Sequence, residues 1–312
     1  MDKNDYNSEN AEIMSRVLVL GAGGMLGHKL CQGLSEHHEI VGTVKKDAGF
    51  YDKYHQIFKN VKLIGGVDVL DNEKLEQTIR NAAPDVIINC VGIVKQLKEA
   101  NNTFLSVAIN SFLPHKLATL CADIGTRLIT ISTDCVFDGT HGGYRENDFS
   151  DARDLYGKSK FLGETTSEET AAVTLRTSFI GRELTTPTHG LIEWFLAQQK
   201  KTVRGFEKAV YSGFTSIELA KIIALIIKNY PNICGVYQVA SKPITKYNLL
   251  HLVKEIFELD VNITCDKDFC CDLSLNMDKF AQTTGYIAPS WEEMIRKMYK
   301  DPTDYDSKRK ND

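Results

Sequence analysis

The sequence lacks the features that mark membrane, secreted and nucleic-acid-binding proteins. No apolar run among its 312 residues approaches the roughly 20 residues that a membrane-spanning helix requires. Residues 1–14 are polar and acidic, unlike the basic and then apolar start of a signal peptide, so we expect a disordered leader there. A net charge of −4 gives no electrostatic basis for binding nucleic acid or an anionic membrane. We therefore expect a cytoplasmic protein.

Paired metal-binding cysteines are also missing. Of the eight cysteines, Cys265, Cys270 and Cys271 lie close together, but without a Cys-x-x-Cys pair or a nearby histidine. We predict no metal site there and a reduced, cytosolic protein. Most of the other cysteines lie in apolar segments, where this residue is usually a small buried hydrophobe.

The first half of the sequence alternates short apolar runs with helical stretches. The apolar runs are continuous, which is typical of parallel strands that helices cover on both faces. The pattern predicts an α/β fold with a Rossmann-type, doubly wound parallel sheet. The expected strands are 16–20, 39–44, 61–64, 85–90, 127–132 and 172–176, and the expected helices are 26–34, 73–81, 104–124 and 155–164.

The alternation changes after Gly181. Helices are expected over 191–199, 216–228, 247–258 and 290–299, with a strand over 236–239, and Trp194 is expected in the core. The absence of a low-complexity linker favours a second region packed closely on the first. The predicted organisation is a Rossmann domain over 15–181, to which a strand at 236–240 returns, a smaller α/β substrate-binding region over 182–235 and 241–302, and a flexible tail over 303–312.

A glycine-rich turn joins the first expected strand to the first expected helix. Gly21, Gly24 and Gly27 let the turn close and bring backbone N–H groups and the helix N-terminus against a pyrophosphate. This strand–turn–helix context predicts dinucleotide binding. After the second strand, Lys45 and Lys46 stand where an NAD-preferring site usually has an acid, and lysines suit the 2′-phosphate of NADP. NADPH is therefore the expected cofactor, with NADH as the alternative.

A Tyr-x-x-x-Lys motif lies in the expected helix at 155–164. Tyr156 and Lys160 share one helical face, so the ammonium can lower the phenol pKa and reach the cofactor ribose. An unperturbed tyrosine titrates near ~10, so this assistance matters for proton transfer near neutral pH. The bare motif also occurs by chance, but here the strand before it delivers Thr133 to the carboxyl edge of the sheet, where ligands bind.

With these motifs the chain resembles the extended short-chain dehydrogenases/reductases. Within that superfamily it most resembles the dTDP-4-dehydrorhamnose reductase group of nucleotide-sugar 4-ketoreductases. The similarity covers roughly Arg16 to Gly181. It rests on the glycine turn and on Asp68-Val69, Asn89-Cys90-Val91-Gly92, Asn110, Ser132-Thr133-Asp134-Cys135-Val136-Phe137-Asp138-Gly139, Tyr156-Gly157-Lys158-Ser159-Lys160 and Leu175-Arg176-Thr177-Ser178.

The resemblance implies a role for each matching residue in reducing a 4-keto group. Thr133 would hydrogen-bond the substrate carbonyl, and Tyr156 would donate the proton to its oxygen. Lys160 would tune Tyr156 and bind the nicotinamide ribose, while Asn110 would support the proton relay. The implied cofactor contacts are Gly21, Gly23, Gly24, Met25, Leu26, Gly27, Lys45, Lys46, Asp68, Val69, Cys90, Val91, Gly92, Tyr156 and Lys160, with Asp68 and Val69 beside adenine.

Two departures from the group concern the sugar. Cys135 stands where the group often has tyrosine, and Phe179 where it often has tryptophan. The expected substrate is a nucleotide-linked 6-deoxy-4-ketohexose, either dTDP-4-dehydrorhamnose-like or a UDP-linked N-acetylated sugar. The later segment 189–194 is a natural place to hold it. The expected substrate contacts are Cys135, Phe179, Arg204 and Tyr211, with Arg204 as a candidate for the diphosphate.

Other functions of this fold differ in single features. Dehydratases of the superfamily place an Asp-Glu pair after the threonine, and Asp134-Cys135 lacks that glutamate, which argues against elimination of water. A 4-epimerase uses the same tyrosine and lysine but retains its NAD tightly. A regulatory subunit like the β subunit of methionine adenosyltransferase would bind NADP and a partner enzyme. The epimerase and the regulatory subunit both stay as alternatives to a reductase. The resemblance also implies a homodimer.

Overall fold

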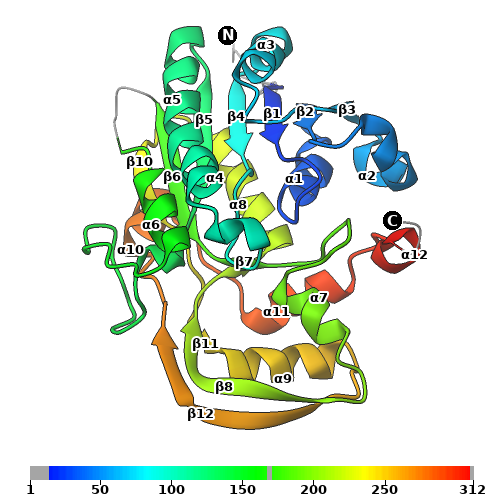
Figure 1. Cartoon of the computed structure of the whole chain (residues 1–312), viewed down its shortest axis with the longest axis vertical. Coiled ribbons are helices and arrows are strands. Elements are labelled where there is room, and N and C mark those ends of the chain that lie inside the picture. Colours follow the sequence, from blue (N-terminus) through cyan, green and yellow to red (C-terminus); the bar gives the residue numbers. More distant parts are fainter. Residues whose placement is uncertain (1–13, 167–170, 310–312) are drawn as a thin grey trace, which may run out of the picture.

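A seven-stranded parallel sheet forms the larger part of the computed structural model, which describes residues 14–166 and 171–309. The strand order is β10-β6-β5-β4-β1-β2-β3, so the late strand β10 lies at the sheet edge beside β6 (Figure 1). This architecture confirms the predicted Rossmann-type α/β fold. The strands are β1 Arg16–Leu20, β2 Glu39–Thr43, β3 Val61–Ile64, β4 Val86–Asn89, β5 Arg127–Thr133, β6 Ala172–Thr177 and β10 Gly235–Gln238.

Helices cover both faces of this sheet. Val17 and Val19 of β1 belong to one apolar cluster, and Leu18 and Leu20 belong to another, with all four side chains fully buried. This is why the strand reads as a continuous apolar run rather than an alternating one. The first cluster includes α1 Gly27–Leu34, α2 His55–Phe58 and α8 Ser216–Asn229, and the second includes α3 Asn72–Ala82 and α5 Leu113–Ile124.

The predicted helix over 104–124 is helical throughout but not uniform. It consists of α4 Thr103–Ser106, a π-helical turn over Val107–Phe112, and α5. The wider turn carries Asn110, which is buried against α6 Leu155–Leu162 through a hydrogen bond to Ser159. Such turns are rare and occur frequently at functional sites.

The second region contains a three-stranded sheet of order β11-β8-β12. β8 Thr202–Tyr211 pairs in parallel with β12 Asn262–Asp272 and antiparallel with β11 Ile244–Thr245. The sequence did not predict β8 and β12, because both are rich in polar residues and β12 is mostly exposed. The remaining elements are β7 Phe179–Ile180, β9 Phe214–Thr215, α7 Leu191–Leu196, α9 Lys246–Ile256, α10 Asp278–Thr284, α11 Trp291–Tyr299 and α12 Tyr305–Arg309.

Two predictions about this region are wrong. Trp194 is 44% exposed, because Ile192 and Phe195 of the same helix fill the core instead. The described part of the expected tail is not a solvated chain, because residues 305–309 form α12 and Tyr305 is only 2% exposed. The expected leader at 1–13 and residues 310–312 lie outside the described residues.

Several surface features bear on what the chain can bind. Within residues 14–166 and 171–309, no helix has the length and apolar character needed to cross a membrane. Cys265, Cys270 and Cys271 are free thiols on β12.

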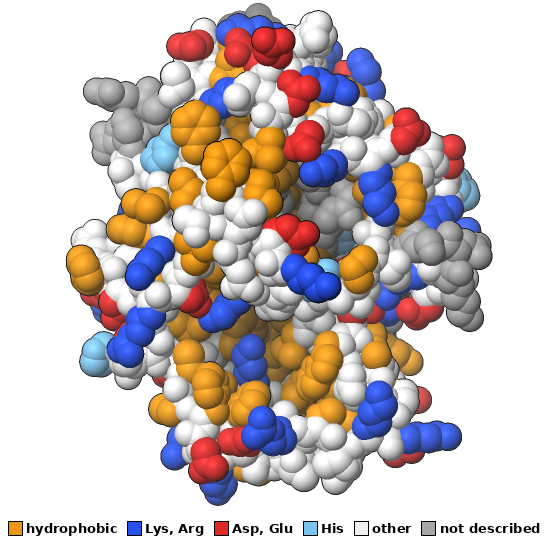
Figure 2. Space-filling view, in the orientation of Figure 1, with side chains coloured by type: hydrophobic (Ala, Val, Ile, Leu, Met, Phe, Trp, Pro, Cys, Tyr) orange, Lys and Arg blue, Asp and Glu red, His pale blue; other side chains and the backbone are white. Residues whose placement is uncertain are grey.

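Figure 2 shows apolar side chains gathered on the upper part of the molecule. A groove of about 630 Å³ is lined by exposed residues that include Leu70, Phe104, Val107 and Phe112. The homodimer stays a prediction.

Candidate active site

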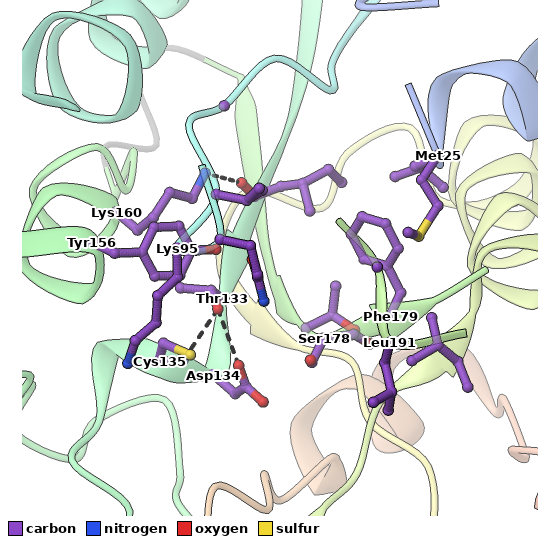
Figure 3. Close-up of a pocket in the computed structure, with 18 of the residues that line it drawn as sticks. Met25, Lys95, Thr133, Asp134, Cys135, Tyr156, Lys160, Ser178, Phe179 and Leu191 are labelled. Carbon is purple, nitrogen blue, oxygen red and sulfur yellow. Dashed lines mark hydrogen bonds between the residues drawn. The ribbon is translucent and has the colours of Figure 1, made fainter. Parts of the chain in front are cut away.

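A cleft of about 420 Å³ lies at the carboxyl edge of the large sheet, between the two regions (Figure 2). Figure 3 shows Thr133, Tyr156 and Lys160 on one side and Met25, Phe179 and Leu191 on the other. The cleft thus has a Rossmann wall and a wall that the second region helps to build. The sequence-predicted residues that line it are Gly24, Met25, Leu26, Cys90, Val91, Gly92, Thr133, Cys135, Tyr156, Lys160, Phe179 and Tyr211.

Backbone conformation at Gly21 and close packing at Gly27 both require glycine in this turn. Gly21 has a φ of +81°, a left-handed conformation that favours glycine. A Cβ on Gly27 would lie 2.1 Å from the carbonyl oxygen of Gly21, so only glycine allows the first strand and α1 to approach this closely. These two glycines do not line the cleft themselves; they fix the shape of the turn whose later residues do.

The same turn fits a dinucleotide pyrophosphate. The first N–H groups of an α-helix have no partner within the helix, and no side chain caps the start of α1. The His28 N–H already donates to the Gly24 carbonyl oxygen, and the other N–H groups at this end, with the positive end of the helix dipole, can bind an anion in the cleft. Lys160 lies deeper in the cleft, with its Nζ 3.9 Å from where a Cβ on Gly92 would stand. The residues present thus fit a nicotinamide dinucleotide.

Local sequence fixes the helix that carries Tyr156. Asp154 caps the start of α6, and its Oδ1 accepts a hydrogen bond from the Gly157 N–H at 2.8 Å. A Cβ on Gly157 would lie 2.1 Å from the carbonyl oxygen of Cys135, so the glycine allows α6 to lie directly against the turn that follows β5. This close approach brings Tyr156 beside Thr133 (Figure 3).

The cleft shifts the pKa values of its tyrosine and lysine in opposite directions. Burial raises the pKa of Tyr156, so the phenol holds its proton at neutral pH. Burial lowers the pKa of Lys160 to about 8, so its ammonium is still largely charged at pH 7. Lys160 Nζ donates one hydrogen bond, of 2.6 Å, to the carbonyl oxygen of Ile131. An ammonium has three N–H donors, so two remain for the phenol and a ribose.

Thr133 is bonded to its neighbours rather than free. Its Oγ1 donates to Oδ1 of Asp134 at 3.0 Å (Figure 3). It also accepts from the Cys135 N–H at 3.2 Å. Asp134 is 4% exposed, and burial raises the pKa of its carboxyl group. Asp134 thus holds the Thr133 hydroxyl, which can rotate to donate to a ligand in the cleft instead. The sequence did not predict this role for Asp134.

Asn110 lies behind the Rossmann wall and does not line the cleft. Its side chain accepts from the Ile93 N–H at 2.9 Å and donates to the Ile93 carbonyl at 3.0 Å. It also donates to Ser159 Oγ at 3.1 Å, and Ser159 lies between Tyr156 and Lys160 on α6. These contacts hold the loop after β4 and the helix of the Tyr-Lys pair together. The relay role that the resemblance implied stays a prediction.

The residues expected to surround the adenosine half lie outside the lining of this cleft. Lys45 Nζ pairs with Asp68 Oδ2 at 2.9 Å, and Lys46 Nζ lies 3.6 Å above the centre of the Phe50 ring. Val69 lines the apolar groove near Phe104 instead. Lys45 and Lys46 follow β2 as predicted, and both side chains are exposed.

Arg204 does not reach the cleft, so the prediction that it contacts substrate there is wrong. Its guanidinium is exposed and pairs with Asp266 of β12 at 3.1 Å. Only Val210 and Tyr211, at the other end of β8, line the cleft. Tyr211 is seven positions after Arg204 along the strand, a span of about 23 Å, and an odd number of positions places the two side chains on opposite faces.

Several cleft residues were not predicted. Lys95 and Lys246 are the lining lysines besides Lys160 among the described residues. Lys95 pairs with Asp154 at 2.6 Å, and Lys246 begins α9. Ser178 belongs to the Leu175-Arg176-Thr177-Ser178 motif, but the motif did not indicate that it lines the cleft. Glu183 and Leu273 carry no sequence signal, because tertiary packing alone brings them to the cleft. His189, Gly190 and Leu191 line the cleft from the segment expected to hold the substrate.

Cys135 is expected to act by its shape and not as a nucleophile. Burial raises the pKa of this thiol, and a protonated thiol is a poor nucleophile. Cys135→Ser should therefore retain kcat/KM within about threefold, since a hydroxyl of similar size replaces an uncharged thiol. Alkylation by iodoacetamide at pH 7.5, followed by mass spectrometry, should modify the exposed Cys270 well before Cys135. Faster modification of Cys135 would contradict this assignment.

Comparison with known proteins gives consistent matches. The family model described as RmlD substrate binding domain matches residues 14–267. The spore coat polysaccharide biosynthesis protein SpsK of Bacillus subtilis is 29% identical over 244 residues, covering 75% of this chain and 76% of SpsK. A dTDP-4-dehydrorhamnose reductase of Mycobacterium tuberculosis is 31% identical over 155 residues, covering 48% of this chain and 44% of that protein. A structure described as a hypothetical dTDP-4-dehydrorhamnose reductase from Sulfolobus tokodaii is 25% identical, with a TM-score of 0.73, and covers 89% of this chain and 98% of that one.

Proposed function

Because the chain belongs to the RmlD substrate-binding-domain family, we propose that it uses NADPH to reduce the 4-keto group of a nucleotide-linked 6-deoxy-4-ketohexose. Relatives include proteins named dTDP-4-dehydrorhamnose reductase, and the family is one of NAD(P)-dependent oxidoreductases. The observation that carries the proposal is the cleft in which Thr133, Tyr156 and Lys160 meet the glycine turn. The sugar is either dTDP-4-dehydrorhamnose-like or a UDP-linked N-acetylated sugar.

The nicotinamide supplies a hydride when bound; the chain's own residues handle the proton and the position of the ketone. Tyr156, protonated at neutral pH, donates its proton to the carbonyl oxygen as charge develops there. Lys160 lies one turn later on the same helix and also lines the cleft, so its cation can stabilise the phenolate that remains. Its hydrogen bond to Ile131 fixes the direction of the ammonium.

Thr133 is the second donor to the ketone in this proposal. In the structure its Oγ1 donates to Asp134 Oδ1 at 3.0 Å, and this bond is exchanged for one to the ketone when the substrate binds. The Thr133 hydroxyl then turns toward the substrate oxygen. Lys95 and Lys246, rather than Arg204, are the cations of the cleft that would face the substrate phosphates.

The chemistry beside Thr133 separates this proposal from dehydration. The glutamate that follows the aspartate in dehydratases is replaced here by Cys135, a thiol that burial keeps protonated. An epimerase keeps the same tyrosine and lysine but returns the hydride to the sugar. The two activities therefore differ in whether NADPH is consumed.

A panel of dTDP-, UDP- and GDP-linked 4-ketosugars tests the proposal. Each sugar is made in situ by a dehydratase, with and without a 3,5-epimerase, and NADPH or NADH oxidation is followed by absorbance. At least one dTDP- or UDP-linked 6-deoxy-4-ketosugar should oxidise NADPH in proportion to sugar supplied. If no member of the panel consumes either cofactor, the reductase proposal fails.

The choice of NADPH over NADH is tested at the lysines after β2. The variant Lys45→Ala/Lys46→Ala should weaken NADPH binding by about tenfold and NADH binding by less than about twofold, because only NADPH carries the 2′-phosphate. Fluorescence titration measures both dissociation constants. Lys62→Ala removes an exposed lysine from the neighbouring strand β3 and serves as the control. Equal losses for the two cofactors would contradict the preference.

A further inference from the structure

The C-terminal segment 301–309 lies against both walls of the cleft. Figure 1 shows α12 between the part of the molecule that holds α1 and α2 and the part that holds α7 and α11. At one end, Tyr305 contacts His28 of α1, and Asp301 forms an ion pair with Lys29. At the other end, Arg309 pairs with Glu193 of α7. The segment is therefore attached to α1, which follows the glycine turn, and to α7, which follows the cleft-lining residues Glu183, His189 and Gly190.

Tyr305 and the Gly24 carbonyl hold the His28 ring at its two nitrogens. The fully buried His28 ring has Nδ1 2.8 Å from the carbonyl oxygen of Gly24 and Nε2 3.0 Å from the Tyr305 hydroxyl. A carbonyl oxygen only accepts, so Nδ1 carries a proton. Burial lowers the pKa of His28 to about 3, so the ring is neutral and Nε2 is an acceptor. The Tyr305 proton is shared between Nε2 and Asp301 Oδ2, which lies 2.8 Å away.

His28 in turn fixes one peptide of the glycine turn. The Gly24 oxygen accepts from both Nδ1 and the backbone N–H of His28, the latter at 3.1 Å. The Gly24–Met25 peptide is trans, and in a trans peptide the carbonyl oxygen and the following N–H point in opposite directions. Anchoring the Gly24 oxygen on α1 therefore turns the Met25 N–H away from His28, toward the cleft that Met25 lines.

The far end of the segment is held by a second set of contacts. Arg309 donates to both carboxylate oxygens of Glu193 at 2.6 Å, and its Nη2 also bonds the Glu183 carbonyl. Glu193 also accepts from Arg182 Nε at 2.8 Å, and Arg182 Nη2 reaches Asp306 of α12 at 2.8 Å. The side chains of Arg309 and Glu193 are 11% and 5% exposed. These bonds keep α12 in register with the cleft wall, so Tyr305 cannot slide away from His28.

We propose that residues 301–309 are a positioning segment for the cofactor, in which Tyr305 holds the His28 ring in place and His28 aims the Met25 N–H at the pyrophosphate. None of these residues touches the reacting atoms. The inference rests on the proposed function only in that the cleft binds a nicotinamide dinucleotide. It does not depend on which sugar is reduced.

Point variants of the full chain test this role through NADPH binding. Tyr305→Phe removes the hydroxyl at Nε2, and with it one of the two contacts that hold the His28 ring against the Gly24 oxygen. The NADPH dissociation constant should rise about tenfold, as expected for loss of one hydrogen bond to a charged group. Arg309→Ala should raise it in the same direction. Lys308→Ala, which removes a neighbouring charge with no ion pair among the described residues, should leave it unchanged.

A pair of His28 variants separates positioning from general stability. His28→Asn keeps an N–H donor near the place of Nδ1, whereas His28→Leu keeps none; both lose Nε2. NADPH affinity should stay within about threefold of wild type for asparagine and fall about tenfold for leucine. Thermal melting without cofactor shows whether both variants fold.

Fluorescence titration needs no sugar, so the two proposals can fail separately. Equal NADPH dissociation constants for wild type, Tyr305→Phe and His28→Leu would overturn the positioning role alone. Equal losses for His28→Asn and His28→Leu would do the same. A wild-type chain that binds neither NADPH nor NADH would overturn both proposals.

Discussion

Replacing Tyr156 by phenylalanine should lower kcat by about 10²- to 10⁴-fold and change NADPH affinity by less than about twofold. The phenol is the group whose proton the carbonyl oxygen receives, and its raised pKa keeps that proton in place at neutral pH. Phenylalanine keeps the ring and its packing but has no proton to give. Steady-state kinetics with the best substrate of the ketosugar panel measures kcat, and fluorescence titration measures NADPH binding.

Tyr144→Phe is the matched control for this variant. Tyr144 is buried and stacked on Phe137 outside the lining of the cleft, so loss of its hydroxyl should leave kcat close to wild type. A Tyr156→Phe enzyme that retains more than about a tenth of wild-type kcat would contradict the proton-donor assignment, since general acid catalysis contributes at least about 100-fold.

Replacing Lys160 by methionine should lower kcat/KM by at least about 100-fold, because the cation that stabilises the developing phenolate is lost. NADPH affinity should also fall, since the ammonium has donors left for the ribose after its bond to Ile131. This combined loss distinguishes Lys160 from Tyr156, whose replacement affects turnover alone. Lys158→Met, an exposed lysine on the same helix, is the control.

The pH profile tests the same residue without a mutation. Burial lowers the pKa of Lys160 to about 8, so its charge is present below that pH and is lost as the pH rises through it. Tyr156 stays protonated over this range, because its pKa is raised. The kcat/KM for ketone reduction should therefore fall above about pH 8. A profile that stays flat to pH 10 would contradict a requirement for protonated Lys160.

The Rossmann half of the cleft could be predicted because its signals are local. The spacing of Gly21 and Gly27 reflects contacts within one turn, and Tyr156 and Lys160 are one helical turn apart. Thr133 could be placed because every parallel strand of the sheet ends at the same edge. In each case the physical constraint acts over a few residues, so the sequence records it directly.

The second wall could not be predicted in the same way. Arg204 was chosen for its chemistry, but β8 is a long strand whose other end reaches the cleft. Residues 303–309 were predicted to be a solvated tail from their polar composition. Their partners, such as His28 and Glu193, lie far away in sequence, so the composition does not indicate these contacts. Trp194 was assigned to the core from an apolar helical face, yet its neighbours Ile192 and Phe195 occupy that position. Side chains that meet through tertiary packing leave no such local pattern.

The most direct test of the proposed reduction is to follow deuterium from NADPH labelled at the transferring position of the nicotinamide. The wild-type chain and a nucleotide-linked 6-deoxy-4-ketosugar are incubated with the labelled cofactor, and the sugar is examined by NMR. The proposal predicts one NADP⁺ formed for each sugar reduced, deuterium at carbon 4 of the sugar, and none with Tyr156→Phe. A sugar whose configuration is inverted while no NADPH is consumed, or deuterium at another carbon, would contradict it.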